Sequence, residues 1–327
     1  MPTPRVSRSA GNPGAPDRFN ILLALCFVAA GAWQLVLLPL LLLPRNGMWG
    51  LTLIPLALLT NTLWALIHEA IHGSLHSSRR VNAGLGRALA IVFGAPFALL
   101  RWGHLLHHAY SRTPRERSEV FDPAQTGRRR FAYAYYFRLC GGLYLAEVLG
   151  APLLLMPERW LRRAGSSLAR DDNVVALLLQ KLAAPQTLRE ARLDAAVIVA
   201  LLIASAWCYG AYFWMLAAAL LARGFLVSVT DNVYHYGTPL TDVRAANNLE
   251  LPRPLQALLL NFNLHGVHHR APDLGWRALE AEFRRVGAFD GDFAAALLDQ
   301  FRGPLPLTAF NASSGADYAA TSQHASV

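Results

Sequence analysis

The sequence predicts an all-α integral membrane protein built from two transmembrane helical hairpins, with four spans in all. Three observations predict this class. First, the 327 residues are 54% hydrophobic and only 16% charged, with a mean hydropathy of +0.28, so the chain is too apolar for a typical soluble domain. Second, the longest apolar runs come in pairs that are separated by short turns. Third, lysine and arginine are concentrated in the segments on one side of these pairs.

The first hairpin is predicted from two runs near the N-terminus. Residues 20–43 are mostly apolar, and a helix of this length spans about 36 Å, which exceeds a hydrocarbon core of about 30 Å. A cleaved signal peptide is the alternative, because three arginines precede the run. The run is longer than a signal-peptide core, however, and no Ala-x-Ala cleavage site follows it, so a retained span is favoured. After a turn at residues 44–47, the second run, residues 49–67, leads directly into His68.

The second hairpin is predicted between Leu193 and Val229, with the charge-free residues 206–210 as its turn. Two further apolar stretches, residues 83–100 and 131–156, contain arginine, glutamate, glycine or proline at internal positions. We therefore expect these two stretches to form interfacial or partly re-entrant helices rather than uninterrupted spans.

The two ends of the chain and the distribution of charge complete the predicted layout. Residues 1–19 and 303–327 are expected to be disordered tails around one membrane domain, residues 20–302. Three basic residues precede the first span, eighteen fall in residues 77–192 and seven follow the last span, whereas the two turns contain one. By the positive-inside rule, both hairpins enter and leave on the cytoplasmic side of the inner membrane, and both termini lie there. The net charge of +9 is thus expected to face anionic lipid rather than nucleic acid.

Histidines carry the functional signal of this sequence. Ten of the eleven occur in four clusters, all at the predicted cytoplasmic ends of the spans. Spacings of i, i+3 and i+4 place side chains on one helix face, so we expect the three imidazoles of His265, His268 and His269 to converge on a common point. So many imidazoles indicate metal binding and exceed what one ion needs, so two metal ions are predicted. The clusters are His68, His72 and His76; His104, His107 and His108; His235; and His265, His268 and His269.

Three other kinds of metalloprotein share part of this pattern. His68, Glu69 and His72 satisfy the H-E-x-x-H pattern of zinc proteases, in which the glutamate activates water, but a membrane zinc protease leaves eight histidines unexplained. A carboxylate di-iron bundle requires two Glu-x-x-His motifs, and only one is present. A non-enzymatic metal-binding or transport protein would carry its ligands near the midplane of the spans rather than at the hairpin ends.

Four motifs together resemble one family. They are His-Glu-Ala-Ile-His from His68, His-Leu-Leu-His-His from His104, Asp-Asn-Val-Tyr-His-Tyr-Gly from Asp231 and His-Gly-Val-His-His from His265. In this order and on these hairpins, they resemble the membrane fatty acid desaturase superfamily over about residues 20–276. Its relatives include fatty acid hydroxylases, carotenoid-modifying oxygenases and membrane alkane monooxygenases. The resemblance implies four spans beneath a cytoplasmic helical cap whose histidine boxes hold a di-iron centre.

The resemblance also assigns site residues. Two positions depart from the pattern: His76 is an additional histidine, and Asp231 stands where relatives often carry asparagine. Four residues are therefore treated as further metal ligands or as hydrogen-bonding partners of ligands: His76, Asp231, Asn261 and Asn263. The nine metal ligands that the resemblance implies are His68, His72, His104, His107, His108, His235, His265, His268 and His269.

The resemblance and the chemistry together predict an O2-dependent oxidoreductase that acts on C–H bonds of a long-chain lipid, and first of all a fatty acid or acyl-lipid desaturase. No side chain breaks an unactivated C–H bond, so O2 must be reduced as co-substrate at a metal. The resemblance implies two iron ions, which can share the electrons required. A lipid or carotenoid hydroxylase or ketolase, and a terminal-alkene-forming decarboxylase, remain alternatives on the same scaffold.

Electrons must come from outside, because the sequence has no haem-attachment, iron–sulfur or convincing dinucleotide-binding motif. A ferredoxin, rubredoxin or cytochrome b5-like donor is expected. An arginine-rich cytoplasmic face would attract such acidic proteins, and contact with anionic lipid explains the same face equally well. Its residues are Arg112, Arg115, Arg117, Arg128, Arg129 and Arg130.

Overall fold

Helices account for most of the structure, a computed structural model that describes residues 17–168 and 174–310. This confirms the predicted all-α class. In this part of the chain, the strands form only two short parallel pairs: β1 (Val120–Phe121) with β4 (Leu305–Pro306), and β2 (Leu249–Glu250) with β3 (Gly291–Asp292).

The first predicted hairpin is helical on both arms. Its first arm is α1 (Asp17–Ala32), which continues as η1 (Trp33–Leu42), a π-helix that contains Pro39. Proline has no N–H to donate and its ring crowds the preceding turn, so regular α-helical bonding cannot continue through it. The second arm bends by 46° before its last helix. It consists of η2 (Gly47–Thr52), α2 (Leu53–Leu58) and α3 (Thr60–His72).

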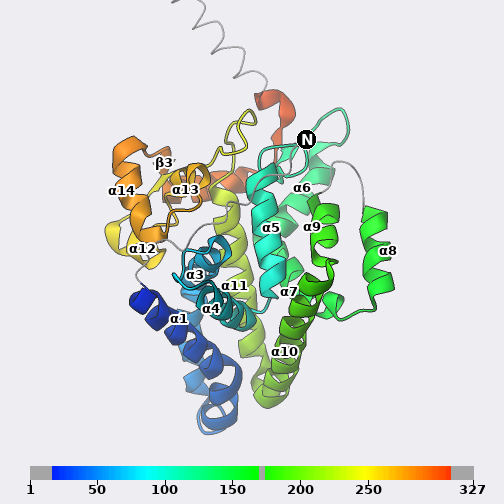
Figure 1. Ribbon diagram of the computed structural model, residues 1–327, viewed down its shortest axis with the longest axis vertical. Coiled ribbons are helices and arrows are strands. Elements are labelled where there is room, and N and C mark those ends of the chain that lie inside the picture. The colour runs from blue at the N-terminus through cyan, green and yellow to red at the C-terminus, as the bar shows by residue number, and fades with distance from the viewer. Residues whose placement is uncertain (1–16, 169–173, 311–327) are drawn as a thin grey trace, which may run out of the picture.

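The second predicted hairpin consists of α10 (Pro185–Tyr209), η4 (Gly210–Tyr212) and α11 (Phe213–Val233). In Figure 1, α10 and α11 reach the lower end of the molecule, where α1 also ends. The predicted turn at residues 206–210 is wrong by several residues. Residues 206–209 complete α10 because none of them breaks a helix, whereas Gly210 adopts φ +48° and ends it.

A sharp break separates α4 (Arg79–Phe93) from α5 (Phe97–Tyr110), whose axes differ by 100°. Gly94 takes φ +104°, a conformation that favours glycine, and Pro96 cannot continue the hydrogen bonding of α4. Residues 83–100, predicted to be interfacial or re-entrant, contain this break.

Arg223, near the middle of α11, satisfies the carbonyl end of α4. Its Nη1 donates to the carbonyl oxygens of Val92 and Phe93 at 3.2 and 3.3 Å, and its Nη2 donates to Gln34 Oε1 at 3.1 Å. The Tyr144 hydroxyl also donates to the Phe93 carbonyl, at 2.6 Å. The last carbonyls of a helix have no partner within it and form the negative end of its dipole, so a buried guanidinium is stabilised there. These contacts hold the end of α4 just before the chain turns into α5.

All but the last two residues of the stretch 131–156 belong to a run of 27 residues, Arg128–Leu154, that is long and apolar enough to cross a membrane, although the sequence predicts interfacial or re-entrant helices there. The run is kinked at Gly141, where φ is +125°. Across the described residues, length and composition give three candidate spans, or up to five if each bent helix pair is one span. The four-span arrangement therefore stays a prediction. The run consists of α6 (Arg128–Phe137), η3 (Arg138–Gly142) and α7 (Leu143–Leu154).

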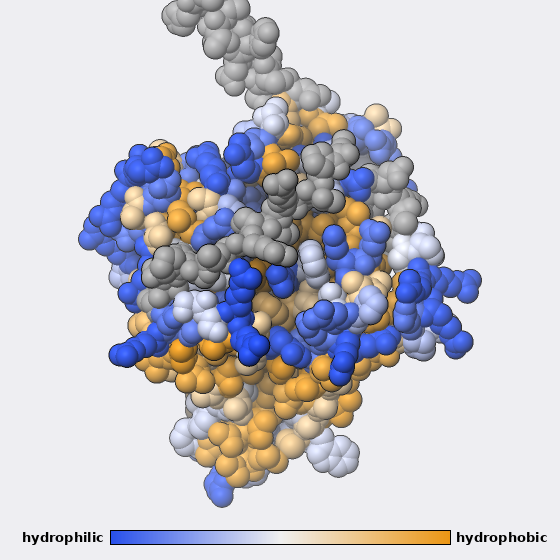
Figure 2. Space-filling model, viewed as in Figure 1, coloured by the Kyte–Doolittle hydropathy of each residue, from blue (hydrophilic) through white to orange (hydrophobic). Residues whose placement is uncertain are grey.

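Shorter helices cover the upper part of the molecule in Figure 1. Figure 2 shows that hydrophobic residues gather on the lower part, around the ends of α1, α10 and α11, while hydrophilic residues dominate above them. This is the distribution expected when the lower part lies in a bilayer. The shorter helices are α8 (Glu158–Leu168), α9 (Val174–Leu182), α12 (Arg253–Leu258), α13 (His265–Arg270), α14 (Trp276–Val286), α15 (Phe293–Asp299) and η5 (Gln300–Arg302).

Both predicted tails are shorter than expected where the structure describes them. Residues 17–19 already belong to α1, and the Asp17 carboxylate accepts the Ser77 N–H at 2.8 Å. Residues 303–310 include β4, and Leu305 donates its N–H to the Glu119 carbonyl at 2.8 Å. Contacts with distant segments order these ends, and composition does not reveal such contacts. The remainder of each predicted tail lies outside the described residues.

Candidate metal centre

The first histidine cluster lies at the end of α3. His68 and His72 are one turn apart, and His68 is only 2% exposed. The helix stops at Gly73, which adopts φ +81°, and the Ser74 N–H bonds the Glu69 carbonyl to complete the C-terminal turn. The chain therefore leaves the helix before His76.

The second and third clusters lie on α5 and α13. His104, His107 and His108 occupy the last turns of α5. The third cluster, which begins at His265, forms most of α13, a six-residue helix that is too short to be stable alone. His235 follows the end of α11.

Asn248 and Gly266 hold α13 in place, and neither was predicted to matter. Asn248 Oδ1 accepts the Val267 N–H at 2.9 Å, which satisfies one of the free donors in the first turn of α13. At Gly266, an added Cβ would lie 2.4 Å from the Ala246 carbonyl oxygen, so only glycine fits without movement. The glycine inside His-Gly-Val-His-His was the single sequence signal of this close approach.

The nine predicted ligands form two groups, in each of which the candidate ligand atoms lie within 4.8 Å of one another. The groups do not follow the sequence clusters. In particular, the prediction that His265, His268 and His269 converge on one point is wrong, because His268 belongs to the other group. The five-histidine group comprises His68, His72, His104, His108 and His268, and the four-histidine group comprises His107, His235, His265 and His269.

Hydrogen bonding does not account for how closely these imidazoles pack. In the five-histidine group, four successive Nε2–Nε2 distances are each 3.0 Å. Each Nε2 has either one proton or one lone pair, so at most two of these four contacts are ordinary hydrogen bonds. A cation at the point where the lone pairs converge would satisfy all of them. The order of the contacts is His72, His104, His108, His268 and His68.

The spacing also indicates the coordination geometry that these residues fit. At a metal–nitrogen distance of about 2.1 Å, ligands at right angles lie about 3.0 Å apart and tetrahedral ligands about 3.4 Å apart. The observed 3.0 Å matches right angles. Together with five imidazoles, this fits a site with more than four coordination positions rather than a tetrahedral zinc site.

Four histidines of the two groups lie outside the candidate spans and are held in the neutral form that binds metals. Burial lowers the pKa of His265, His268 and His269 well below the usual value for histidine, and the neighbouring imidazoles lower it further. Burial is also the main reason that the pKa of His235 is lowered. All four imidazoles therefore offer a lone pair at neutral pH.

Glu116 orients the four-histidine group. Both of its carboxylate oxygens lie 3.0 Å from His107 Nδ1, so the imidazole donates this N–H to Glu116 and presents Nε2 to the group. Burial alone would raise the pKa of Glu116, but His107 and then Arg138 outweigh it and lower the pKa to about 2. His235 is oriented similarly by the Ala245 carbonyl, 3.2 Å from its Nδ1. No motif in the sequence marked Glu116.

His76 and Asp231 lie outside both groups. His76 Nε2 is 3.7 Å from the Asp17 carboxylate, and its Nδ1 accepts the Ser78 N–H at 2.8 Å. Asp231 forms an ion pair with Arg138 at 3.4 Å, beside a small cavity that His107 and His235 also line.

Asn261 and Asn263 also lie outside both groups and bond the backbone around α13. Asn261 Nδ2 donates to the Trp276 carbonyl at 2.8 Å, and Asn263 Nδ2 donates to the Leu249 carbonyl at 2.8 Å. Both contacts hold the main chain of the third cluster rather than an imidazole.

Glu69, the glutamate of H-E-x-x-H, does not join either histidine group. Its Oε2 accepts hydrogen bonds from Ser74 Oγ at 2.7 Å and from the Trp276 N–H at 3.2 Å. A zinc protease needs this carboxylate beside a metal-bound water, and this arrangement does not provide it.

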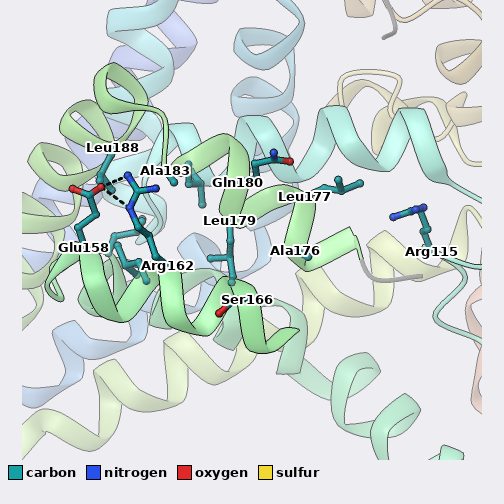
Figure 3. A pocket seen from close by; sticks show the side chains of 14 residues that line it. Arg115, Glu158, Arg162, Ser166, Ala176, Leu177, Leu179, Gln180, Ala183 and Leu188 are labelled. Carbon is teal, nitrogen blue, oxygen red and sulfur yellow. Dashed lines mark hydrogen bonds and ion pairs between the residues drawn. The ribbon is translucent and has the colours of Figure 1, made fainter. Parts of the chain in front are cut away.

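Two larger cavities lie away from the histidines. One of about 530 Å³ lies between α8, α9 and the start of α10, beside the Glu158–Arg162 ion pair, and no histidine lines it (Figure 3). The other, of about 500 Å³, is mostly apolar and lies among α4, η3, α7, α10 and α11. Phe93 in its wall packs on Trp64, whose ring centroid is 6.4 Å from that of His104. The second cavity therefore approaches the five-histidine group through two aromatic rings.

The arginine-rich face is only partly exposed, because Arg115 and Arg117 are half-buried and Arg112 is buried. Arg112 is 2% exposed, forms an ion pair with Glu119 and donates to the Thr238 carbonyl at 2.7 Å. Glu119 is equally buried, so the two opposite charges are paired away from water. Arg128, Arg129 and Arg130 are exposed at the start of α6, as expected.

Comparison with known proteins agrees with the site. The family model for fatty acid desaturases matches residues 47–300, a range that includes all nine histidines of the two groups. No curated protein matches the chain. Because the family model covers most of the chain, this protein belongs to the fatty acid desaturase family.

Proposed function

We propose that this protein is an O2-dependent di-iron oxidoreductase that acts on C–H bonds of a long-chain lipid, and specifically a fatty acid or acyl-lipid desaturase. The observation that carries the proposal is the pair of histidine groups, five and four imidazoles with convergent ring nitrogens. Family membership supports a lipid oxidoreductase.

The two groups are the proposed iron sites. His68, His72, His104, His108 and His268 hold one ion, and His107, His235, His265 and His269 hold the other. Two iron ions bound there would supply the redox chemistry that activates O2 and removes hydrogen from an alkyl chain. Asp231 lines the same small cavity as His107 and His235. We propose that its carboxylate serves the four-histidine group as a further ligand or as a hydrogen-bonding partner of a ligand.

The chain's own residues prepare the site for this chemistry. Glu116 and the Ala245 carbonyl hold the rings of His107 and His235 with Nε2 facing the four-histidine group. The apolar cavity behind Phe93 offers a place for a hydrocarbon chain within the helices of the membrane domain. These features support a long apolar substrate.

The proposed electron source is an external ferredoxin, rubredoxin or cytochrome b5-like protein on the cytoplasmic side. The exposed arginines Arg128, Arg129 and Arg130 would attract its acidic surface. The concentration of basic residues between the hairpins supports a cytoplasmic metal centre.

Metal analysis and lipid analysis test the proposal together. We expect about two irons per purified chain, and a change in total lipids, seen by mass spectrometry, when the protein is expressed with a reductase system. His268→Ala should lose iron and abolish the lipid change. His76→Ala is the matched control, because His76 lies outside both groups, and it should retain both. One zinc per chain with unchanged lipids would refute the proposal.

A further inference from the structure

Glu69 is directed at the start of α14 rather than at a metal. It is 4% exposed, and its Oε2 accepts the Trp276 N–H at 3.2 Å and Ser74 Oγ at 2.7 Å. Trp276 is the first residue of α14, so its N–H has no partner within the helix and lies at the positive end of the helix dipole. A carboxylate is well suited to that position.

Trp276 is held on three sides. Glu69 accepts its backbone N–H, and Asn261 Nδ2 donates to its carbonyl oxygen at 2.8 Å. Its indole Nε1 donates to Asn20 Oδ1 at 3.1 Å. Asn20, which is fully buried in α1, also donates to the Leu75 carbonyl at 2.8 Å. Trp276 thus joins α1, the end of the first cluster and the third cluster.

These contacts fix the third cluster relative to the first. Asn261 and Trp276 flank α13, and their hydrogen bond closes the segment between them into a loop. Glu69 ties this loop to α3 at the residue next to His68. His68 Nε2 in turn lies 3.0 Å from His268 Nε2 on α13. The carboxylate contact and the histidine contact therefore connect the same two segments.

We propose that Glu69 is a positioning residue, which holds α13 against α3 and thereby keeps His268 in the five-histidine group. It does not activate water or transfer a proton. This inference rests on the proposed function, because it takes the five-histidine group as an iron site.

Two substitutions of Glu69 test the inference. Glu69→Gln keeps an oxygen that accepts the Trp276 N–H, so this variant should retain two irons and near-normal activity. Glu69→Leu has a similar size but no acceptor. Its affinity for one of the two irons should fall about 10–100-fold, as for other residues that orient ligands, so a chelator should reduce its content toward one iron per chain.

Controls separate positioning from general loss of stability. Asp194→Leu removes another buried carboxylate, the partner of Arg87, and should lower the melting temperature without faster release of iron. If Glu69→Leu does not fold, Asn261→Ala opens the same loop at its other end and should also release iron faster than the wild type.

Two outcomes would overturn the inference: loss of activity in Glu69→Gln with both irons retained, or release of iron from Glu69→Leu and Asn261→Ala at the wild-type rate. Wild-type protein without iron would instead refute the proposed function. In that case, cobalt(II) loaded into the two groups, and its release by a chelator from the same variants, tests the Glu69 contact.

Discussion

Replacing Arg223 with leucine tests how α4 ends inside the helix bundle. The substitution removes the donor to the Val92 carbonyl and to Gln34 Oε1, whereas the Phe93 carbonyl keeps the Tyr144 hydroxyl. Each buried acceptor left without a partner costs about 1–3 kcal/mol in proteins generally. Hydrogen bonds between membrane helices average only about 0.6 kcal/mol, and leucine also avoids burying a charge. We therefore expect a loss of about 2–4 kcal/mol, in the lower half of the range set by two acceptors.

The assay is thermal unfolding in detergent, followed by tryptophan fluorescence. About 2–4 kcal/mol corresponds to a fall in melting temperature on the order of 3–6 °C for a chain of 327 residues. Arg223→Lys keeps the charge but has a single side-chain nitrogen, so its melting temperature should lie between those of the wild type and Arg223→Leu. Tyr144→Phe removes one of two donors to Phe93 and should cost about 1 kcal/mol. An Arg223→Leu protein that melts at or above the wild-type temperature would refute this account of the break.

Three further predictions concern the metal centre. Gly266→Ala places a Cβ 2.4 Å from the Ala246 carbonyl oxygen, so it should destabilise the fold by about 1–3 kcal/mol and release iron. Gly84→Ala is the control, because an added Cβ there meets no neighbouring segment within 4 Å, and it should keep both stability and iron. Equal iron contents in the two variants would contradict this prediction. Glu116→Gln weakens the acceptor for the His107 Nδ1–H, so cobalt(II) titration should show about 10–100-fold lower affinity at one of two sites. Unchanged affinity at both sites would count against the role of Glu116 in orienting His107. The lowered pKa of His235, His265, His268 and His269 means that the unfolded chain binds more protons below the usual histidine pKa of about 6.5. Metal-stripped protein should therefore melt at a lower temperature at pH 5.5 than at pH 7.5, and the opposite order would disprove that reasoning.

The helices of the apolar runs and the gathering of nine histidines were predictable because each depends on local pattern. Long apolar runs specify helices whatever they pack against, so residues 20–43 and 49–67 are helical as expected over most of their length. The capping of the carbonyl end of α4 and the burial of Arg112 were not predictable in the same way. The first depends on Arg223 reaching across from α11, and the second on the ion pair with Glu119.

His76 shows that periodicity predicts a shared helix face only as far as the helix continues. At i+8 from His68 it would lie near the same face of a continuous helix. Gly73 ends α3 first, so His76 contacts Asp17 instead. Gly73, directly after His72, is a helix-ending residue that the spacing of the histidines alone does not take into account.

Helix geometry explains why the second and third clusters, which begin at His104 and His265, each divide between the two groups. Successive residues turn by about 100°, so an i, i+4 pair is offset by about 40°, whereas residue i+3 lies about 100° from residue i+4. Accordingly His104 and His108 share the five-histidine group while His107 joins the other, and His265 and His269 share the four-histidine group while His268 leaves it. The H-x-x-H-H spacing thus distributes its histidines over two groups rather than one.

A structural consequence follows for the distance between the proposed irons. Helix α5 gives two imidazoles to the five-histidine group and one to the four-histidine group, and α13 gives one and two in the reverse order. Both groups therefore share the same two helices, and the separation of the ions depends on how α5 and α13 face each other. Helix α13 is too short to hold that position by itself, so Asn248, Gly266 and the Glu69–Trp276 contact determine it. Residues outside both histidine groups thus set the position of the two groups relative to each other.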